Sequence, residues 1–294
     1  MAAIAVAGAI PAAAQDDLAD ATVEAVRLAK GVYMLRGRGG NIGLSVGEDG
    51  AFLVDDQYAP LTEKIRAAVA SVTDGPIRFV INTHWHGDHT GGNENLGEAG
   101  ALIVAHENVR RRMSVENFIE AFGRRTGPAP EAALPVITFT DSITFHWNGD
   151  ELRVFHVDPA HTDGDSIIYF TRANVIHLGD TYFNGMYPFI DASTGGRMDG
   201  MIAAADRVLQ MAGPKTRLIP GHGEVSGVKE YRDYRAMLVE VRDRVRRLID
   251  RGKGRDEVIA AKPTRDLDDK WGGGFLEPDA WVGIVYDSMT VGRR

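Results

Sequence analysis

Cysteine is absent from this chain of 294 residues. The fold therefore contains no disulfide bond, and zinc cannot be held by thiolate. Any bound metal ion must take its ligands from His, Asp and Glu. Because proteins without cysteine occur in both reducing and oxidising compartments, this absence does not locate the protein.

The sequence also lacks an excess of positive charge and a long hydrophobic run. It carries 33 basic and 41 acidic residues, which give a formal net charge of −8. A nucleic-acid-binding protein would usually present a basic face, so we expect a small-molecule substrate and no nucleic acid. No segment has the roughly 20 consecutive apolar residues that span a bilayer, so we expect no stable membrane association. The oligomeric state stays open.

The first 14 residues differ from the rest in composition. They are mostly apolar or small, and the run Ala12, Ala13 and Ala14 before Gln15 resembles the small-residue cleavage site of a signal peptide. We interpret residues 1–14 as the remnant of a secretory signal peptide, and residues 15–294 as a single domain that is periplasmic or secreted. The basic residues that normally precede such a segment are missing, so the alternative is an alanine-rich tail on a cytoplasmic protein.

The order of strands and helices predicts the fold class. Apolar runs bounded by turn residues predict strands at 32–35, 42–46, 51–54, 77–82, 101–105, 143–147, 152–157, 166–170, 174–178 and 217–220. Helical spacing predicts helices at 62–72, 198–211 and 228–249, and another that begins at Glu107. A run of strands, a helix and a strand thus occurs twice. This order predicts an α+β fold with two β-sheets face to face, helices outside and two similar halves.

One segment points to chemistry: His84-Trp85-His86-Gly87-Asp88-His89, directly after the predicted strand 77–82. Imidazole and carboxylate are the nitrogen and oxygen donors that zinc prefers. A strand that ends in such a turn presents several donors to one point at the edge of its sheet. The segment therefore predicts a metal site.

Three further donors follow predicted strands, each with a small residue near it: His161, Asp180 and His222. Seven donors are too many for one zinc ion, which needs about four, and are suitable for two. Two His residues separated by one residue in an extended segment point the same way, so His84 and His86 share an ion. We assign His84, His86 and His161 to the first ion and Asp88, His89 and His222 to the second, with Asp180 and a hydroxide bridging both.

The motif from His84 to His89, with the later His161, Asp180 and His222 in strand-end loops beside glycine, resembles the metallo-β-lactamase fold superfamily of hydrolases. The resemblance covers nearly the whole chain from about residue 25. It implies a four-layer αβ/βα sandwich, in agreement with the order of the elements. It also implies a role for Asp55, which resembles the acidic strand-end residue of the family's first motif.

Two such ions would lower the pKa of bound water toward about 7, which predicts a binuclear zinc hydrolase with hydroxide as the nucleophile. Asp88 is the expected catalytic residue, as a ligand of the second ion and as the group that orients the water or accepts its proton. The two ions with Asp88, Asp180 and hydroxide leave a net charge of about +1, which favours an anionic transition state.

The metal is expected to be zinc, although manganese or iron can occupy the same ligands where their supply favours it. A redox di-iron protein or a zinc-storage protein is the alternative from another functional class. Oxygen-reducing relatives with two irons usually have glutamate at the position of His86, so this histidine favours zinc and hydrolysis.

The sequence is compatible with two classes of substrate for a hydrolase. The β-lactamases of the family most often carry cysteine, or in one group serine, at the position of Asp180, and often a lysine a few residues later, which residues 181–187 lack. The first reading is a β-lactamase-like enzyme with weak β-lactam hydrolysis. The alternative is a hydrolase of esters, thioesters, lactones or phosphodiesters. Asn184 and Tyr187 are candidates to orient a carbonyl or carboxylate, and residues 35–41 are expected to form a flexible loop over the site.

Overall fold

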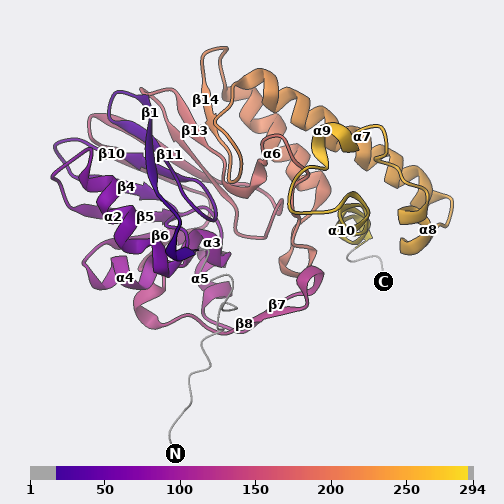
Figure 1. Ribbon diagram of the computed structural model, residues 1–294, viewed down its shortest axis with the longest axis horizontal. Helices are drawn as coiled ribbons and strands as arrows, with labels where there is room; N and C mark the ends of the chain where they lie inside the picture. The colour runs from indigo at the N-terminus through magenta and orange to yellow at the C-terminus, as the bar shows by residue number, and fades with distance from the viewer. Residues whose placement is uncertain (1–17, 291–294) are drawn as a thin grey trace, which may run out of the picture.

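A computed structural model describes residues 18–290 of the protein (Figure 1). Residues 1–17 and 291–294 lie outside this description, and with them the predicted signal-peptide remnant at 1–14. Within the described range, the structure contains no helix that is both long enough and apolar enough to cross a lipid bilayer.

The first sheet is built mainly from the N-terminal half of the chain. Its seven strands lie in the order β1 (Glu24–Ala29), β2 (Val32–Arg36), β3 (Ile42–Ser45), β4 (Ala51–Val54), β5 (Ile77–Asn82), β6 (Leu102–His106) and β9 (Ile137–Phe139). The first four strands are antiparallel, whereas β4, β5, β6 and β9 are parallel. Because parallel strands end at the same edge, the segments that follow β4, β5 and β6 meet there.

The second sheet repeats this plan with fewer strands. Its order is β10 (Ser142–Trp147), β11 (Asp150–His156), β12 (Ser166–Phe170), β13 (Val175–His177) and β14 (Arg217–Ile219). The antiparallel run ends in a parallel pair, β13 with β14. The predicted similarity of the two halves is therefore present in the topology.

Helices cover the outer faces of both sheets. The helices of the first half are α2 (Thr62–Ala70), α3 (Gly87–Thr90), α4 (Asn93–Glu98) and α5 (Glu107–Met113). Those of the second half are α6 (Met198–Met211), α7 (Val228–Asp250), α8 (Arg255–Ala260), α9 (Asp268–Trp271) and α10 (Pro278–Thr290). Figure 1 shows α2 and α4 on one side of the stacked sheets and α6 and α7 on the other.

Adjacent residues of the strands point into different layers. Phe52 and Ile168 belong to the core between the sheets. Their neighbours Leu53 and Ile167 pack in the opposite direction, against the helices of the first and second halves respectively. This alternation, with apolar residues on both faces, is the signature of sheets buried on both sides. The expected α+β fold, a four-layer αβ/βα sandwich, is confirmed.

Several elements of the structure were not expected from the sequence, among them those near the end of the chain. The unpredicted elements are β1, β9, the hairpin of β7 (Asn117–Ile119) and β8 (Arg124–Thr126), and α8 to α10. The strands β7, β8 and β9 have three residues each, too few to show a period. Helix α10 buries Trp281, Ile284 and Met289 on several sides, so its pattern lacks the polar face that identifies a surface helix.

Candidate metal centre

The seven predicted donors follow strands that end at one edge of the sandwich. His84 and His86 come directly after β5, and the short helix α3 carries Asp88 and His89. His161, Asp180 and His222 follow β11, β13 and β14. The structure brings them together as two groups, His84, His86, His161 and Asp180, and Asp88, His89 and His222, each with its donor atoms within 4.8 Å of one another.

Asp180 lies between the two groups. Its Oδ2 is 3.5 Å from Nε2 of His161 and 3.9 Å from Nε2 of His84 in the first group. In the second group, its Oδ1 is 3.1 Å from Nε2 of His89 and its Oδ2 is 3.4 Å from Nε2 of His222. A carboxylate in this position can donate one oxygen to each of two cations.

Several polar atoms of the cluster point at one another without hydrogen bonds. Nε2 of His84, Nε2 of His89 and Oδ1 of Asp180 are fully buried and have no hydrogen-bond partner within residues 18–290. A buried polar atom without a partner destabilises a fold by about 1–3 kcal/mol. These three atoms are all of metal-ligand types and belong to both groups of donors, an arrangement that fits bound cations.

The pKa values show how strongly these groups are coupled. Burial alone would raise the pKa of Asp180, but His222, His89 and His161 hold it well below its usual range. Burial lowers the pKa of His84 well below its usual value, so its imidazole is neutral and has a free lone pair. Burial would also lower the pKa of His222, but Asp180 and Asp88 raise it to about 9. A metal ion held by His222 would have to displace this proton.

Asp55 supports the cluster from behind, as the resemblance implied. Its Oδ2 accepts a hydrogen bond from Nδ1 of His89 at 2.7 Å, which directs Nε2 of that ring toward Asp180. The same carboxylate accepts hydrogen bonds from the backbone N–H and the hydroxyl of Thr83. Asp55 has a φ of 66°, an uncommon backbone conformation for a residue with a side chain.

A second supporting carboxylate, Asp191, was not predicted. Its Oδ2 lies 3.0 Å from Nε2 of His86, so Nδ1 of that ring faces the cluster, 2.9 Å from Nε2 of His161. Burial alone would raise the pKa of Asp191, but the hydrogen bond from His86 lowers it to about 2. Asp191 is 105 residues from His86 in the sequence, and no local pattern of donors distinguishes it.

The loop between β2 and β3, which was expected to be flexible, lies over the cluster and is joined to it by backbone hydrogen bonds. Gly40 N–H donates to the backbone oxygen of Asp88 at 3.0 Å, and the Gln57 side chain donates to the oxygen of Gly40 at 2.7 Å. A Cβ at Gly40 would lie 2.0 Å from Cε1 of His89. The loop can approach this closely only because glycine has no side chain.

The polar atoms of the two expected substrate-binding residues have other partners. The hydroxyl of Tyr187 donates to Asp268 at 2.9 Å, and its ring stacks on Trp281 with centroids 4.0 Å apart. The Asn184 side chain donates to the backbone oxygen of Glu224 and accepts from the Tyr182 hydroxyl. In the described chain these two side chains join loops and do not line the cavity at the site.

A cavity of about 420 Å³ opens above the donors. His86, Asp88, Asp180 and His222 form part of its wall, and the rest is mainly aromatic. The other lining residues are Gly39, Tyr58, Trp85, Gly87, Ile119, Phe122, Arg124, Thr126, Phe183, Phe189 and Phe275. A volume of this size is typical of a small-molecule site.

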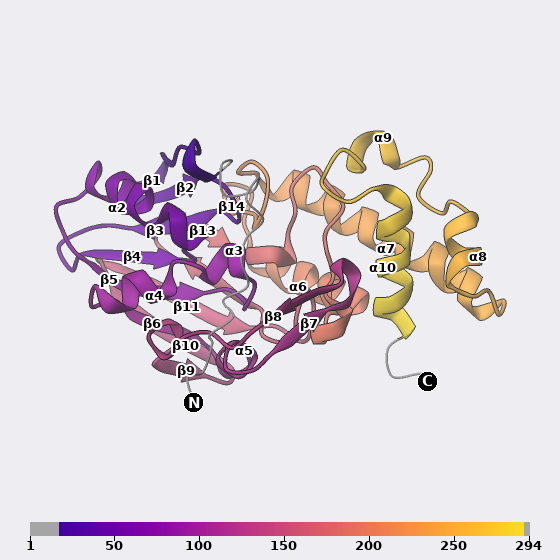
Figure 2. The same ribbon diagram turned by 60° about the horizontal axis from the view of Figure 1, so that its bottom comes forward.

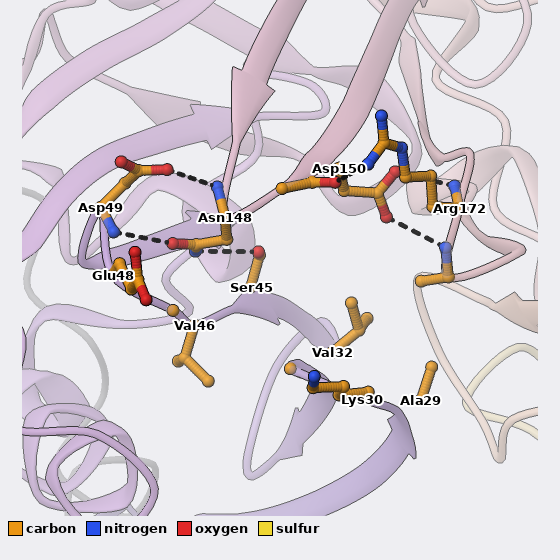
Figure 3. Close-up of a pocket in the computed structure, with 14 residues that line it drawn as sticks. Ala29, Lys30, Val32, Ser45, Val46, Glu48, Asp49, Asn148, Asp150 and Arg172 are labelled. Carbon is orange, nitrogen blue, oxygen red and sulfur yellow. Dashed lines mark hydrogen bonds between the residues drawn. The ribbon is translucent and has the colours of Figure 1, made fainter.

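A second cavity, of about 720 Å³, lies at the opposite end of the sheets (Figure 3). Its central polar side chains are used within the fold. The Asn148 side chain donates hydrogen bonds to the Ser45 hydroxyl and the backbone oxygen of Gly50, and accepts one from the backbone N–H of Asp49. Asp150 accepts hydrogen bonds from the backbone N–H groups of Arg172 and Ala173. This cavity has the larger volume, but none of the predicted donors lines it, so it is not the candidate metal centre.

Known proteins resemble this chain in sequence. The chain is 28% identical over 109 residues to the hydroxyacylglutathione hydrolase of Pelagibacter ubique, covering 37% of each protein. It is 29% identical over 187 residues to the enzyme of the same name from Gloeobacter violaceus, covering 61% of this chain and 63% of that protein. The matched regions thus span less than two thirds of these curated relatives.

Solved structures share the fold at lower identity. A metallo-beta-lactamase from Pontibacter korlensis superposes with a TM-score of 0.61 at 18% identity, over 74% of this chain and 99% of that one. A sec-alkylsulfatase from a Pseudomonas species superposes with a TM-score of 0.65 at 19% identity, over 90% of this chain and 50% of that one. The sequence profile of the metallo-beta-lactamase superfamily matches residues 35–223, more than half of the chain, and the protein therefore belongs to that superfamily.

Proposed function

We propose that this protein is a hydrolase of small molecules that uses two metal ions, with zinc as the metal. The observation that carries this proposal is the position of Asp180, within 3.9 Å of imidazole nitrogens in both groups of donors. As part of the same proposal, the enzyme acts in the periplasm or outside the cell, supported by the composition of residues 1–14.

The ligand assignment follows the two groups. His84, His86 and His161 would hold the first ion, and Asp88, His89 and His222 the second, with Asp180 shared. Bound there, the ions would supply Lewis-acid activation of water and of the substrate's electrophilic group.

Asp88 is the proposed catalytic residue. It lines the cavity, and its Oδ2 lies 3.3 Å from Nε2 of His222. Burial alone would raise the pKa of Asp88, but His89 and His222 hold it well below its usual range. The carboxylate is therefore ionised at neutral pH. In that form it can orient a water molecule and accept its proton.

The first substrate class we propose is a β-lactam amide, hydrolysed weakly. The alternative class comprises esters, thioesters, lactones and phosphodiesters. Two observations favour the alternative: an aspartate, not cysteine, joins the two groups of donors, and several relatives are hydroxyacylglutathione hydrolases, whose substrates are thioesters. Both classes present an electrophilic centre that the same donors and Asp88 can serve.

A substrate panel with measured metal content tests the proposal. The zinc-loaded protein is assayed on a chromogenic cephalosporin, an acylglutathione and a phosphodiester, beside buffer containing the same zinc. Turnover of the cephalosporin no faster than in that buffer would refute the lactam reading. Predominant iron together with oxygen reduction would overturn the hydrolytic one.

Substitution of Asp88 tests its assigned role. We expect Asp88→Ala to lower kcat by about 10²–10⁴-fold on whichever substrate is turned over, with an unchanged circular dichroism spectrum. Asp74→Ala, at an exposed carboxylate, is the matched control and should leave kcat unchanged. Retained activity in Asp88→Ala would show that the assignment is wrong.

Metal analysis of His84→Ala tests the ligand assignment separately. Removing this donor should deplete the first ion, which atomic emission of the dialysed protein measures. An unchanged metal-to-protein ratio would refute the assignment of His84.

A further inference from the structure

The hairpin β7–β8 stands apart from both sheets of the sandwich. It forms its own two-stranded sheet, with Asn117, Phe118 and Ile119 paired to Thr126, Arg125 and Arg124. In Figures 1 and 2 it lies between α5 and the C-terminal helices. The backbone N–H of Glu120 donates to the Ser193 hydroxyl, which joins the hairpin to the segment after β13.

The two faces of this hairpin have different surroundings. The pair Ile119 and Arg124, with Thr126, lines the cavity above the donors. The next pair, Phe118 and Arg125, belongs to the opposite face because successive side chains of a strand alternate. One of two adjacent arginines is therefore placed at the cavity.

The two arginines also differ in their partners. Arg125 forms a 2.7 Å ion pair with Glu116, and its guanidinium lies 5.0 Å from the centroid of the Phe118 ring. The side chain of Arg124 forms no ion pair or hydrogen bond within residues 18–290. Its charge does reach the cavity, since it acts to lower the pKa of Tyr58 on the cavity wall, although burial and Asp88 raise that pKa overall to about 12.

Aromatic rings extend from the donors to the mouth of the cavity on one side. Phe189 stacks on the ring of His86, with centroids 5.9 Å apart. Phe122, in the turn of the hairpin, packs on Phe189 at 4.7 Å and is 49% exposed. This side of the cavity is therefore an apolar wall that begins at a proposed metal ligand and ends in solvent.

The other side repeats the arrangement. Phe183 stacks on the ring of His222 at 5.0 Å, and Phe275 lies 6.3 Å from Phe183. Phe275 is 59% exposed and comes from the segment between α9 and α10. Large exposed apolar side chains that line a polar site are typical of ligand recognition.

We propose that this cavity selects small amphiphilic carboxylates, whose apolar group lies between Phe122 and Phe275 and whose anionic group binds Arg124. The guanidinium presents several N–H donors in a plane, which matches a carboxylate. This inference rests on the proposed function, since the substrate's reacting group would lie at Asp180 and Asp88. It narrows the substrate class to molecules that carry an apolar, ring-sized group and a carboxylate besides the bond that is hydrolysed.

Titration calorimetry with two matched probes tests the role of Arg124. The zinc-loaded protein is titrated with 4-phenylbutyrate and with the neutral 4-phenylbutanamide. We expect Arg124→Ala to weaken binding of 4-phenylbutyrate about tenfold and to leave the amide unchanged. Arg125→Ala, on the opposite face, should change neither affinity. The difference between the probes should shrink at high salt, because Arg124 is exposed.

Three results would overturn the assignment: no saturable binding of 4-phenylbutyrate to the unmodified protein, no effect of Arg124→Ala, or an equal loss for both probes. If Arg124→Ala has no effect while the carboxylate binds, the anion is held by the metal ions and Arg124 is an ordinary solvated side chain.

The apolar half of the cavity has its own test. Phe122→Ala and Phe275→Ala should each weaken both probes, whereas Phe118→Ala, on the outer face of the hairpin, should weaken neither. Unchanged affinities in the first two variants, with unchanged melting temperatures, would refute the apolar site. Because binding is measured without turnover, a protein that shows this pattern but hydrolyses nothing would contradict the proposed function alone.

Discussion

At the scale of single residues, the candidate site depends on carboxylates with different tasks. Asp180 lies among the imidazoles of both donor groups, whereas Asp55 and Asp191 hold His89 and His86 by their other ring nitrogens. Such a hydrogen bond selects the tautomer of the imidazole and fixes the direction of its free nitrogen. The supporting carboxylates therefore decide where the donor atoms point.

Substitution of Asp191 measures this support. We expect Asp191→Ala to lower metal affinity or kcat by about 10–100-fold, although the residue is not a proposed ligand. Metal content after dialysis and kcat with added zinc measure the two effects separately. Asp199→Ala, which removes an exposed carboxylate of α6, is the control. Equal metal content and kcat in Asp191→Ala and the unmodified protein would contradict the role of Asp191.

The sequence predicted the positions of the proposed donors, but not which residues support them or line the cavity. His84 to His89 are nearly adjacent, and each remaining donor follows a predicted strand, so type and position both identified them. Asp191 follows no predicted strand and has no donor beside it. Asn184 and Tyr187 have suitable polar groups, but the sequence does not show that Glu224 and Asp268 occupy them.

At the scale of elements, the loop between β2 and β3 forms one wall of the donor cluster. It is held by hydrogen bonds to the backbone of Asp88, to Gly221 and to the side chain of Gln57. Its closest approach is at Gly40, where the backbone contacts the ring of His89. The element therefore restricts where that ring can lie.

Adding a methyl group at Gly40 tests this packing. We expect Gly40→Ala to displace the loop or the His89 ring, which should lower the free energy of unfolding by about 1–3 kcal/mol and deplete the second metal ion. Denaturant titration and metal analysis measure the two effects. Gly273→Ala has nothing within 4 Å of the added atom and should change neither. A full metal content in Gly40→Ala would show that the contact has no role in the site.

Prediction of the elements depended on their length. The helix predicted at 228–249 is observed as α7, Val228–Asp250, because 23 residues provide several turns of apolar spacing. The hairpin β7–β8 offers three residues per strand, too few for a period. The sequence therefore did not predict the pairing of β7 with β8, although this hairpin places Arg124 and Phe122 at the cavity.

At the scale of the whole molecule, the two sheets each contribute part of the site. The donors from His84 to His89 follow a strand of the first sheet, whereas His161, Asp180 and His222 follow strands of the second. Neither half holds all seven proposed donors. Binding of the two proposed ions would therefore be coupled to the packing of the two halves.

Removal of the metal tests this coupling. We expect a chelator to lower the melting temperature and added zinc to restore it, since an ion present at about 1,000 times its Kd stabilises the folded state by about 4 kcal/mol. Scanning calorimetry with and without the chelator measures the effect. Identical melting curves would contradict the proposed centre.

The same experiment should depend on pH. In the chain without metal, the pKa of His222 is about 9, above its ordinary value of 6.5. This proton stabilises the metal-free fold fully below the ordinary pKa of histidine, and the stabilisation is lost as the pH rises through about 9. Because a metal ion replaces the proton, the loaded protein should not show this loss. The difference in melting temperature between the metal-loaded and the metal-free protein should therefore widen from about pH 6.5 to about pH 9. A difference that stays constant over this range would contradict the role assigned to His222.

The sequence by itself determined the order of the main strands and helices, the two similar halves and the seven residues that we propose as donors. These features are local: they depend on periodicity and on residue type within a few positions. Only the tertiary structure decided which atoms meet, namely Asp191 with His86, Gly40 with His89, and Arg124 with the cavity. Such contacts join segments distant along the chain, and their geometry is set by how the two sheets and the loops pack.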